Sequence, residues 1–428
     1  AMTSAFVPTF TSHLTLRGRD AAWRLGNLVV NGLLAVTGLL VALGMVFAVP
    51  LVGLLASEYS QVPGKLELTV RLTRIMLPFL SLVAVAVACM GMLNSLHRFF
   101  VPALSPAAFN LATIFAAFAL VPLFRIAGRD PIEAIAVGAL LGGLGQIAIQ
   151  VPTLRREGFR YRPVLDFRDE GLRRVLLLMV PGTVGLAAVQ VNVLVNTILA
   201  TGEQPGAVSW LNYAFRIMYL PIGLLGVSVA TAALPQISKE AARGDLGELR
   251  SRVSGALRLT MAMNLPATFG LMVLAVPIVE VLFERGRFTP EDTAATAAAL
   301  CFYSPGLIGY AAVKIAAPTF YALGDSRKPV LVSVLTMGVN VVLNLILVRW
   351  MSFQGLALGT GIAALINSGL LLVLLRRRIG GLGGRKTAAG MAKVLVASGA
   401  MAAIVWGVER LASLSLPGHG LPSRAARL

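Results

Sequence analysis

The sequence predicts an all-α integral membrane protein, and its composition and its long apolar runs are the two observations behind this prediction. Hydrophobic residues make up 57% of the 428 positions and charged residues only 13%, with a mean hydropathy of +0.81. A soluble globular protein needs more polar residues than this to cover its surface. A helix needs roughly 20 apolar residues to cross a bilayer, and several runs reach that length.

These runs predict about twelve membrane-spanning helices in chain order. The first, at residues 2–14, is only a partial segment. The longer runs lie at 25–49, 75–96, 103–124, 132–154, 175–200, 208–235, 259–283, 295–322, 329–348, 355–375 and 391–408. The connections between them are too short to hold a soluble domain.

Membrane topology explains the formal net charge of +18 better than a nucleic-acid partner does. The basic residues form short clusters between the runs rather than one soluble basic face. Alternate connections carry 22 Lys and Arg residues on one side and 6 on the other. The positive-inside rule places the richer set in the cytoplasm, so we expect a multi-pass protein of the cytoplasmic membrane that binds no nucleic acid.

Prolines at a fixed spacing indicate an internal repeat. The matched pairs, each 227 residues apart, are Pro8 and Pro235, Pro78 and Pro305, and Pro102 and Pro329. An even number of runs separates the members of each pair, so the two copies have the same orientation and form a parallel repeat. We therefore expect two homologous helical lobes and an extra C-terminal helix.

The repeat also predicts the domain boundaries. We expect an incomplete N-terminal lobe at 1–154, a cytoplasmic linker at 155–174, a C-terminal lobe at 175–378 and an extra C-terminal helix region at 379–428. The second lobe has about 55 residues of repeat with no counterpart before Ala1. The sequence is therefore expected to be a fragment, cut at one or both ends.

Arg216 is the first candidate binding residue, because it lies about nine residues into the apolar run 208–235. Placing an arginine in the middle of a membrane helix costs about 2.5–3.5 kcal/mol. It could form an ion pair with a carboxylate on a neighbouring helix, or it could bind an anionic substrate. Few acids lie inside the runs, and a guanidinium gives bidentate hydrogen bonds to a diphosphate. These points favour substrate binding.

Lys314 is the second candidate, in a run that also contains Pro305 and Pro318. As a point charge it could attract the same anionic head group. It could also extend along its own stem to the interface, or bind carbonyls freed near Pro318.

Four polar residues in apolar runs form a further candidate group: Asn196, Asn340, Asn344 and Thr360. Asn340 and Asn344 are four residues apart and share one helix face. Hydrogen bonds between helices, worth about 0.6 kcal/mol on average, explain such residues without a ligand.

No enzyme chemistry can be assembled from the remaining residues. Cys89 and Cys301 lie in apolar runs and the three histidines are scattered, which supports neither a disulfide framework nor a metal site. A membrane enzyme acting on polyprenyl phosphates should show clustered acids or a metal-binding aspartate pair, and neither pattern occurs. No nucleophile, base and orienting acid come together inside the runs.

Four segments resemble a known family: "SAFVP" (4–8), "VSWLNYAFRIMYLPIGLLGVSVATAALPQIS" (208–238), "ERGRFTPEDT" (284–293) and "APTFYALGDSRKPV" (317–330). They are similar to the MurJ (MviN) lipid II flippases of the multidrug/oligosaccharidyl-lipid/polysaccharide exporter superfamily. The resemblance covers essentially the whole sequence. It implies two six-helix lobes around a central cavity with two further C-terminal helices, of which this sequence lacks the first helix, most of the second and the last.

The resemblance implies a bacterial inner-membrane flippase that moves undecaprenyl-diphosphate-linked peptidoglycan precursor from the cytoplasmic to the periplasmic leaflet. It assigns Arg216 to the substrate cavity. Some flippases coordinate sodium at the positions of Asn196, Asn340, Asn344 and Thr360, with aspartates at the first and third. Hard cations prefer carboxylates, and this sequence has neutral side chains there, which disfavours sodium coupling.

Three alternatives stay open at this stage: a polysaccharide-lipid exporter, a drug exporter of the same superfamily, or a membrane scaffold that transports nothing. A drug exporter should carry an acid for cationic drugs, where this sequence has Arg216 and Lys314. The sequence itself implies no cofactor apart from the disfavoured sodium ion.

Overall fold

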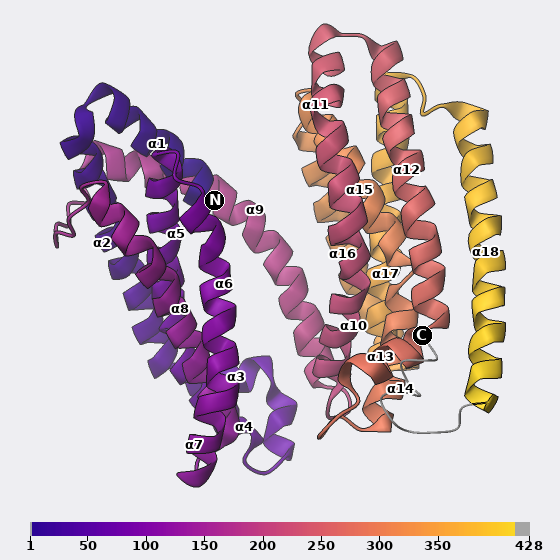
Figure 1. The fold of residues 1–428 in the computed structure, drawn as a ribbon, viewed down its shortest axis with the longest axis horizontal. Coiled ribbons are helices and arrows are strands. Elements are labelled where there is room, and N and C mark those ends of the chain that lie inside the picture. Colours follow the sequence, from indigo (N-terminus) through magenta and orange to yellow (C-terminus); the bar gives the residue numbers. More distant parts are fainter. Residues whose placement is uncertain (1, 416–428) are drawn as a thin grey trace. The chain divides into compact units, whose positions relative to one another are not determined.

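The computed structural model describes residues 2–415, and the side chains at 2–5, 178, 180–189, 385–388 and 412–415 lie outside the described part. Every regular element in the described part is a helix (Figure 1). The chain divides into two compact units, Ala1–Gln190 and Val191–Leu428. The division falls within one long helix, α9 (Glu170–Thr201).

Unit 1 contains eight helices, two short irregular turns and the first part of α9. They are α1 (Met2–Leu16), α2 (Gly18–Val46), α3 (Ala48–Leu55), a 3₁₀ turn (Ser57–Gln61), α4 (Lys65–Met76), α5 (Phe79–Ser95), α6 (Phe100–Phe115), a π-helical turn (Ala116–Leu120), α7 (Val121–Ile126) and α8 (Pro131–Arg156). One core cluster is built where α1, α2 and α5 meet, around Phe6, Phe10, Trp23 and Met92.

Unit 2 contains the end of α9, nine further helices and a second π-helical turn. They are α10 (Ala207–Pro221), the π-helical turn (Ile222–Gly226), α11 (Val227–Arg243), α12 (Leu246–Val273), α13 (Ala275–Phe283), α14 (Pro290–Tyr303), α15 (Gly306–Ala322), α16 (Arg327–Met351), α17 (Phe353–Ile379) and α18 (Gly384–Ser415). Separate core clusters lie around Met218 and Leu300 and around Leu257 and Phe320.

Among the described residues, nine helical stretches are long and apolar enough to cross a membrane, and the bent pair α14–α15 adds a tenth. The predicted run 295–322 is this bent pair, with a 45° change of direction at the break. Pro305 lies at the break, where its missing N–H cannot continue the preceding turn. The predicted run 175–200 lies in α9, whose side chains are only partly described.

The helix boundaries follow the spacing of the proline pairs. Moving α5 (Phe79–Ser95) along by 227 residues gives 306–322, the bounds of α15 (Gly306–Ala322). The same shift moves α2 to 245–273, one residue from the bounds of α12 (Leu246–Val273). The breaks at Pro78 and Pro305 therefore occupy matched places in the two units.

The connection between α8 and α9 is held against α2 within unit 1. The Asn27 side chain donates to the carbonyl of Arg160 (3.0 Å) and accepts from the N–H of Arg162 (2.7 Å). Asn31 donates to the carbonyls of Arg162 (2.8 Å) and Val164 (2.9 Å). The linker expected at 155–174 is thus packed on unit 1 over this stretch.

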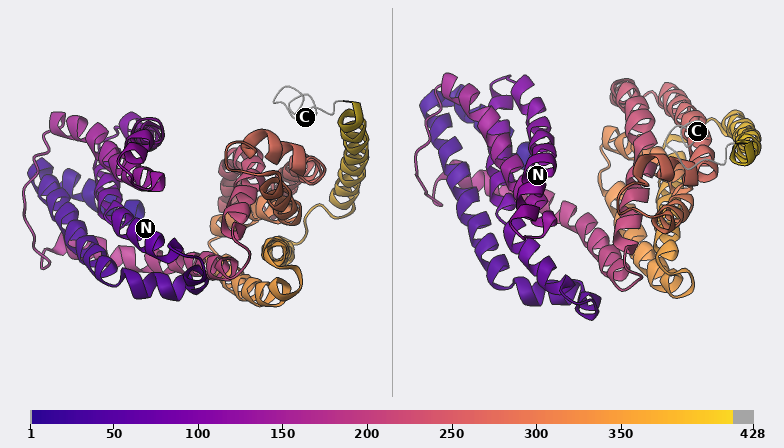
Figure 2. Two further views of the ribbon diagram at one scale, coloured as in Figure 1. Left: turned by 90° about the horizontal axis from the view of Figure 1, so that it is seen from below. Right: turned by 60° about the horizontal axis from the view of Figure 1, so that its bottom comes forward.

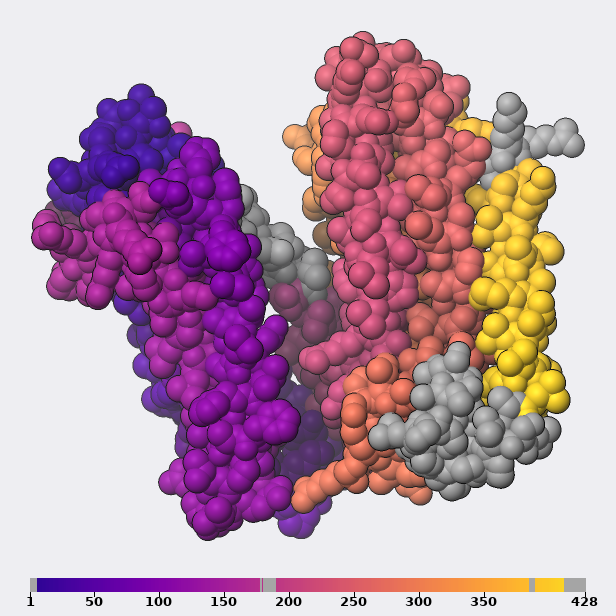
Figure 3. Space-filling model, viewed as in Figure 1, coloured from indigo at the N-terminus to yellow at the C-terminus, as the bar shows by residue number. Residues whose placement is uncertain are grey.

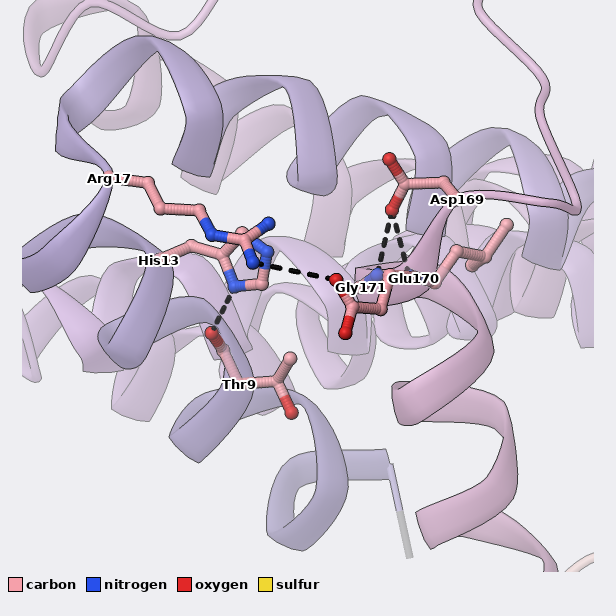
Figure 4. A network of polar contacts seen from close by, with 7 residues as sticks. Thr9, His13, Arg17, Asp169, Glu170 and Gly171 are labelled. Carbon is pink, nitrogen blue, oxygen red and sulfur yellow. Dashed lines mark hydrogen bonds and ion pairs between the residues drawn. The ribbon is translucent and has the colours of Figure 1, made fainter.

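The N-terminal end of α9 is fixed beside the C-terminal end of α1, as Figure 4 shows. The Asp169 carboxylate accepts from the N–H of Gly171 at 2.9 Å and caps the helix. Arg17 lies 3.5 Å from Glu170 across the two elements, and His13 Nδ1 contacts the Thr9 carbonyl at 2.9 Å. The cap fixes where α9 begins.

The last described helix, α18, runs beside α12 along the edge of unit 2 (Figures 2 and 3). It corresponds to the extra C-terminal helix expected at 379–428, of which residues 416–428 lie outside the described part. Apolar side chains Met391 and Val394 join α18 to the core cluster around Leu257.

Candidate functional site in unit 2

Arg216 lies on the exposed side of α10, in a 37-residue apolar stretch that runs from Ala207 to Arg243. The opposite side of α10 packs into the core of unit 2 through Leu211, Ala214 and Met218. One turn after Arg216, Pro221 interrupts the hydrogen-bonding ladder and the π-helical turn follows. The guanidinium therefore projects from the middle of a buried-on-one-side helix, next to a local irregularity.

Arg216 makes no hydrogen bond or ion pair with any described residue. The ion pair considered for this arginine is therefore absent from the described part of the chain. A charged side chain at this depth usually faces a wet cavity or a partner rather than acyl chains. The exposed side of the same stretch also presents Asn212, Ser228 and Thr231, which makes it more polar than a lipid-facing surface.

An aromatic cluster fixes α10 against the bent pair α14–α15. The Phe215 ring lies 5.6 Å from the Tyr303 ring and 6.3 Å from the Tyr310 ring. Tyr219 stacks on Phe215 at 5.7 Å and meets Tyr310 edge-on at 6.5 Å. These contacts hold the backbone of α10 on both sides of Arg216.

Lys314 is half-buried on α15, one turn beyond Tyr310. Like Arg216, it has no hydrogen bond or ion pair with a described residue, so no bond to a carbonyl freed by Pro318 is present there. Because Tyr219 and Tyr310 touch, the two cations lie about one helical turn from either side of one ring contact. The structure thus places both predicted cations on neighbouring helices of unit 2.

The four polar residues proposed as a cation site do come together. Asn344 Nδ2 donates to Asn196 Oδ1 at 2.6 Å and to Asn340 Oδ1 at 3.2 Å. Asn340 Nδ2 contacts the Thr360 hydroxyl at 3.5 Å, and that hydroxyl donates to the Leu356 carbonyl at 2.8 Å. We call this set, Asn196, Asn340, Asn344 and Thr360, the asparagine network; it connects α9, α16 and α17.

The chemistry of the asparagine network does not fit a tightly bound cation. It holds no carboxylate, and the oxygens of Asn196, Asn340 and Thr360 already accept hydrogen bonds from neighbouring amides. Only Asn344 Oδ1 is buried without a partner. One neutral oxygen is fewer than the several oxygen ligands that hard cations take.

Two polar contacts of the helices were not found by sequence reasoning. Trp210 Nε1 donates to Asp292 at 2.7 Å and ties the start of α10 to the start of α14. In unit 1, Arg71 lies 2.8 Å from Glu133 and joins α4 to α8. Each pair is more than 60 residues apart in sequence, so no local pattern indicates it.

The fold is shared with solved transporter structures. A lipid II flippase MurJ in an inward closed conformation matches with a TM-score of 0.78 at 24% identity, over 95% of this chain and 81% of that one. An inward-facing multidrug resistance MATE family transporter of the MOP superfamily matches with a TM-score of 0.72 at 16% identity, over 90% of this chain and 87% of that one. The chain thus has the fold of the membrane transporters of this superfamily.

Sequence comparison then separates the families that share this fold. The family model described as "Lipid II flippase MurJ" matches residues 1–418, and the chain belongs to this family. It is 34% identical to a probable lipid II flippase MurJ of Rhizobium meliloti, over 88% of this chain and 70% of the relative. It is 32% identical to a lipid II flippase MurJ of Burkholderia cenocepacia, over 88% of this chain and 73% of the relative.

Membership in this family has two direct consequences. Its members are transporters, so the chain is not an enzyme. The apolar helices and the family together make it a multi-pass protein of the bacterial inner membrane. The chain spans 58% of the length of a third relative, a probable lipid II flippase MurJ of Vibrio cholerae.

Proposed function

We propose that the protein moves lipid II, the undecaprenyl-diphosphate-linked peptidoglycan precursor, from the cytoplasmic to the periplasmic leaflet by alternating access. The observation that carries this proposal is Arg216, an exposed cation without a partner among the described residues, in the middle of an apolar helix. A diphosphate supplies the negative charge that this guanidinium lacks in the described structure.

The surroundings of Arg216 suit a diphosphate in two further ways. Arg216 can donate two parallel hydrogen bonds to phosphate oxygens, and charge-assisted bonds of this kind are about twice as strong as neutral ones. Lys314 adds a second positive charge on the neighbouring helix. We infer that Arg216 grips the diphosphate and that Lys314 strengthens the positive potential around it.

The charge of the site favours an anionic lipid over a cationic drug. A drug exporter would need a free carboxylate inside the spans, whereas buried Glu133 is paired with Arg71 and buried Glu240 with Arg243. A polysaccharide-lipid substrate shares the polyprenyl diphosphate, so the same site would serve it. A scaffold without transport would have no use for an unpaired cation at this depth.

The first prediction concerns Arg216→Ala, expressed in bacteria depleted of their own lipid II flippase. We expect at least about a tenfold loss of flipping, because two charge-assisted hydrogen bonds to phosphate are removed. Arg216→Lys should restore flipping poorly, because an ammonium cannot form the bidentate contact. The measurement is the fraction of lipid II that becomes accessible at the periplasmic face.

The control is Arg349→Ala, which removes another exposed arginine in the last turn of α16, outside the apolar part of the span. It should flip lipid II as the unchanged protein does. Normal flipping by Arg216→Ala at equal membrane levels would exclude Arg216 from the site. To separate transport from scaffolding, the depleted cells should accumulate precursor, and an unrelated flippase should rescue them.

A further inference from the structure

A basic cavity lies at the end of unit 2 that the positive-inside rule places in the cytoplasm. Its volume is about 690 Å³, and it is lined by Arg250 of α12, by Arg376 and Arg377 of α17, by Val373 and Leu382, and by the glycine-rich turn at 380–384. The α11–α12 turn and the connection from α17 to α18 lie at the same end of unit 2 (Figure 1). No acidic side chain is among the described residues that line it.

Arg250 is built into the wall of this cavity. Its Nε and Nη2 both donate to the Ile379 carbonyl, at 3.2 and 2.9 Å, at the C-terminal end of α17. A Cβ on Gly380 would lie 2.8 Å from Arg250 Nη2, and Gly380 has φ +75°, so a larger residue would push the guanidinium away. Two N–H groups serve the carbonyl and three of the five remain for a ligand.

Arg376 and Arg377 supply the mobile part of the charge. Both are exposed, and neither forms a hydrogen bond or ion pair through its side chain with a described residue. Other arginines nearby are different: Arg252 is 2.8 Å from Glu248, and Arg243 is 3.7 Å from Glu240. The cavity therefore gathers the arginines of this end whose charge is not offset.

An apolar side chain continues the cavity along the helix toward the membrane. Val373 is 50% exposed and lies one turn before Arg377 on α17. A ligand that fits both parts has a phosphate at the arginines and an acyl chain along Val373. Basic pockets at the cytoplasmic side of membrane helices suit phospholipid head groups for this reason.

We propose that this cavity binds the phosphodiester head group of an anionic phospholipid of the cytoplasmic leaflet. Arg376 and Arg377 hold the phosphate oxygens, and Arg250, fixed by Ile379, forms the floor. The site is distinct from Arg216 and is filled by a lipid that is not transported. Binding there would link α12, α17 and the start of α18 at the membrane surface.

The test measures phosphatidylglycerol binding to the purified full chain in a neutral detergent, by native mass spectrometry at fixed salt. Phosphatidylcholine with the same acyl chains serves as the zwitterionic comparison. We expect preferential binding of phosphatidylglycerol, and Arg376→Ala with Arg377→Ala should weaken it roughly tenfold. The matched control is Arg155→Ala with Arg156→Ala, an exposed arginine pair at the C-terminal end of α8, which should bind as the unchanged chain does.

Three results would overturn the proposal. One is equal weakening by the two double variants, which would mean general surface attraction. Another is equal binding of the two lipids by the unchanged chain. The third is that inorganic phosphate, at the same phosphate concentration, raises the unfolding temperature as much as phosphatidylglycerol does, which would identify a small soluble anion as the ligand.

A second double variant guards against a failure to fold. Arg376→Lys with Arg377→Lys keeps the charge but loses the paired N–H groups, so phosphatidylglycerol binding should fall between that of the unchanged chain and that of the alanine variant. Binding as weak as in the alanine variant, with an unchanged unfolding temperature, would contradict a site that also uses charge. The readout is lipid binding, so it is independent of whether lipid II is the transported substrate.

Discussion

The two units differ at one matched position of the repeat. Glu133 of α8 and Thr360 of α17 are 227 residues apart. Glu133 is a buried carboxylate, 3% exposed, and lies 2.8 Å from Arg71. Thr360 is a neutral hydroxyl that takes part in the asparagine network.

This difference shows that the repeat fixes helix boundaries more tightly than polar chemistry. One unit satisfies a buried polar position with an ion pair, and the other does so with hydrogen bonds between neutral groups. Both arrangements close most of their polar contacts inside their own unit. Arg216 and Lys314 have no such closure among the described residues, and this sets them apart as candidates for substrate binding.

The largest effect on stability is expected from breaking the ion pair in unit 1. Arg71→Ala should lower the free energy of unfolding by about 2–3 kcal/mol, because it leaves the buried carboxylate of Glu133 without a partner. The estimate stays below that for a fully buried pair because the Arg71 side chain is 63% exposed. Thermal unfolding in detergent measures the change.

Two companion variants sharpen this comparison. Adding Glu133→Gln to Arg71→Ala should recover most of the loss, because the remaining buried group is then neutral. The matched change in unit 2, Thr360→Ala, removes one long hydrogen bond and should cost only about 0.6 kcal/mol. Equal losses for Arg71→Ala and Thr360→Ala would contradict the contrast between the charged and the neutral arrangement.

A smaller loss is expected from crowding the asparagine network. A Cβ on Gly359 would lie 2.1 Å from Asn344 Oδ1, so Gly359→Ala must displace that amide and should cost about 1–2 kcal/mol. Gly338→Ala on α16 is the control, because its Cβ would meet nothing within 4 Å. Its unfolding temperature should equal or exceed that of the unchanged protein, and a matching loss would mean that glycine itself, not the network, is required.

The smallest effect concerns sodium. Replacing sodium by potassium at constant ionic strength should leave lipid II flipping unchanged, because the network offers neutral oxygens that are largely occupied. Flipping should still depend on the membrane potential. A sodium requirement that disappears in Asn344→Ala would show instead that the network binds the cation.

Much of the fold follows from the sequence because hydropathy and proline spacing are local signals. The apolar runs mark the spans, and Pro78 and Pro305 mark matched breaks. The bend between α14 and α15 was not foreseen as a break, because the apolar run continues through it. Hydropathy records burial in the membrane but not the direction of a helix.

The candidate site was predictable in its residues and not in its surroundings. Arg216 and Lys314 stand out because a charge in an apolar run is rare, and the spacing of Asn340 and Asn344 places them on one face. The contacts of Phe215 with Tyr303 and of Trp210 with Asp292 join distant segments. One sequence alone contains no signal for such pairs.

The π-helical turn at Ile222–Gly226 sets the rotational phase between the half of the span that carries Arg216 and the half that follows. Each residue rotates an α-helix by about 100°. Deleting one residue here would therefore swing Ile237 and Glu240 of α11 out of their buried positions, while Arg216 stayed in place. Along this span a change in length is more damaging than a change in side chain.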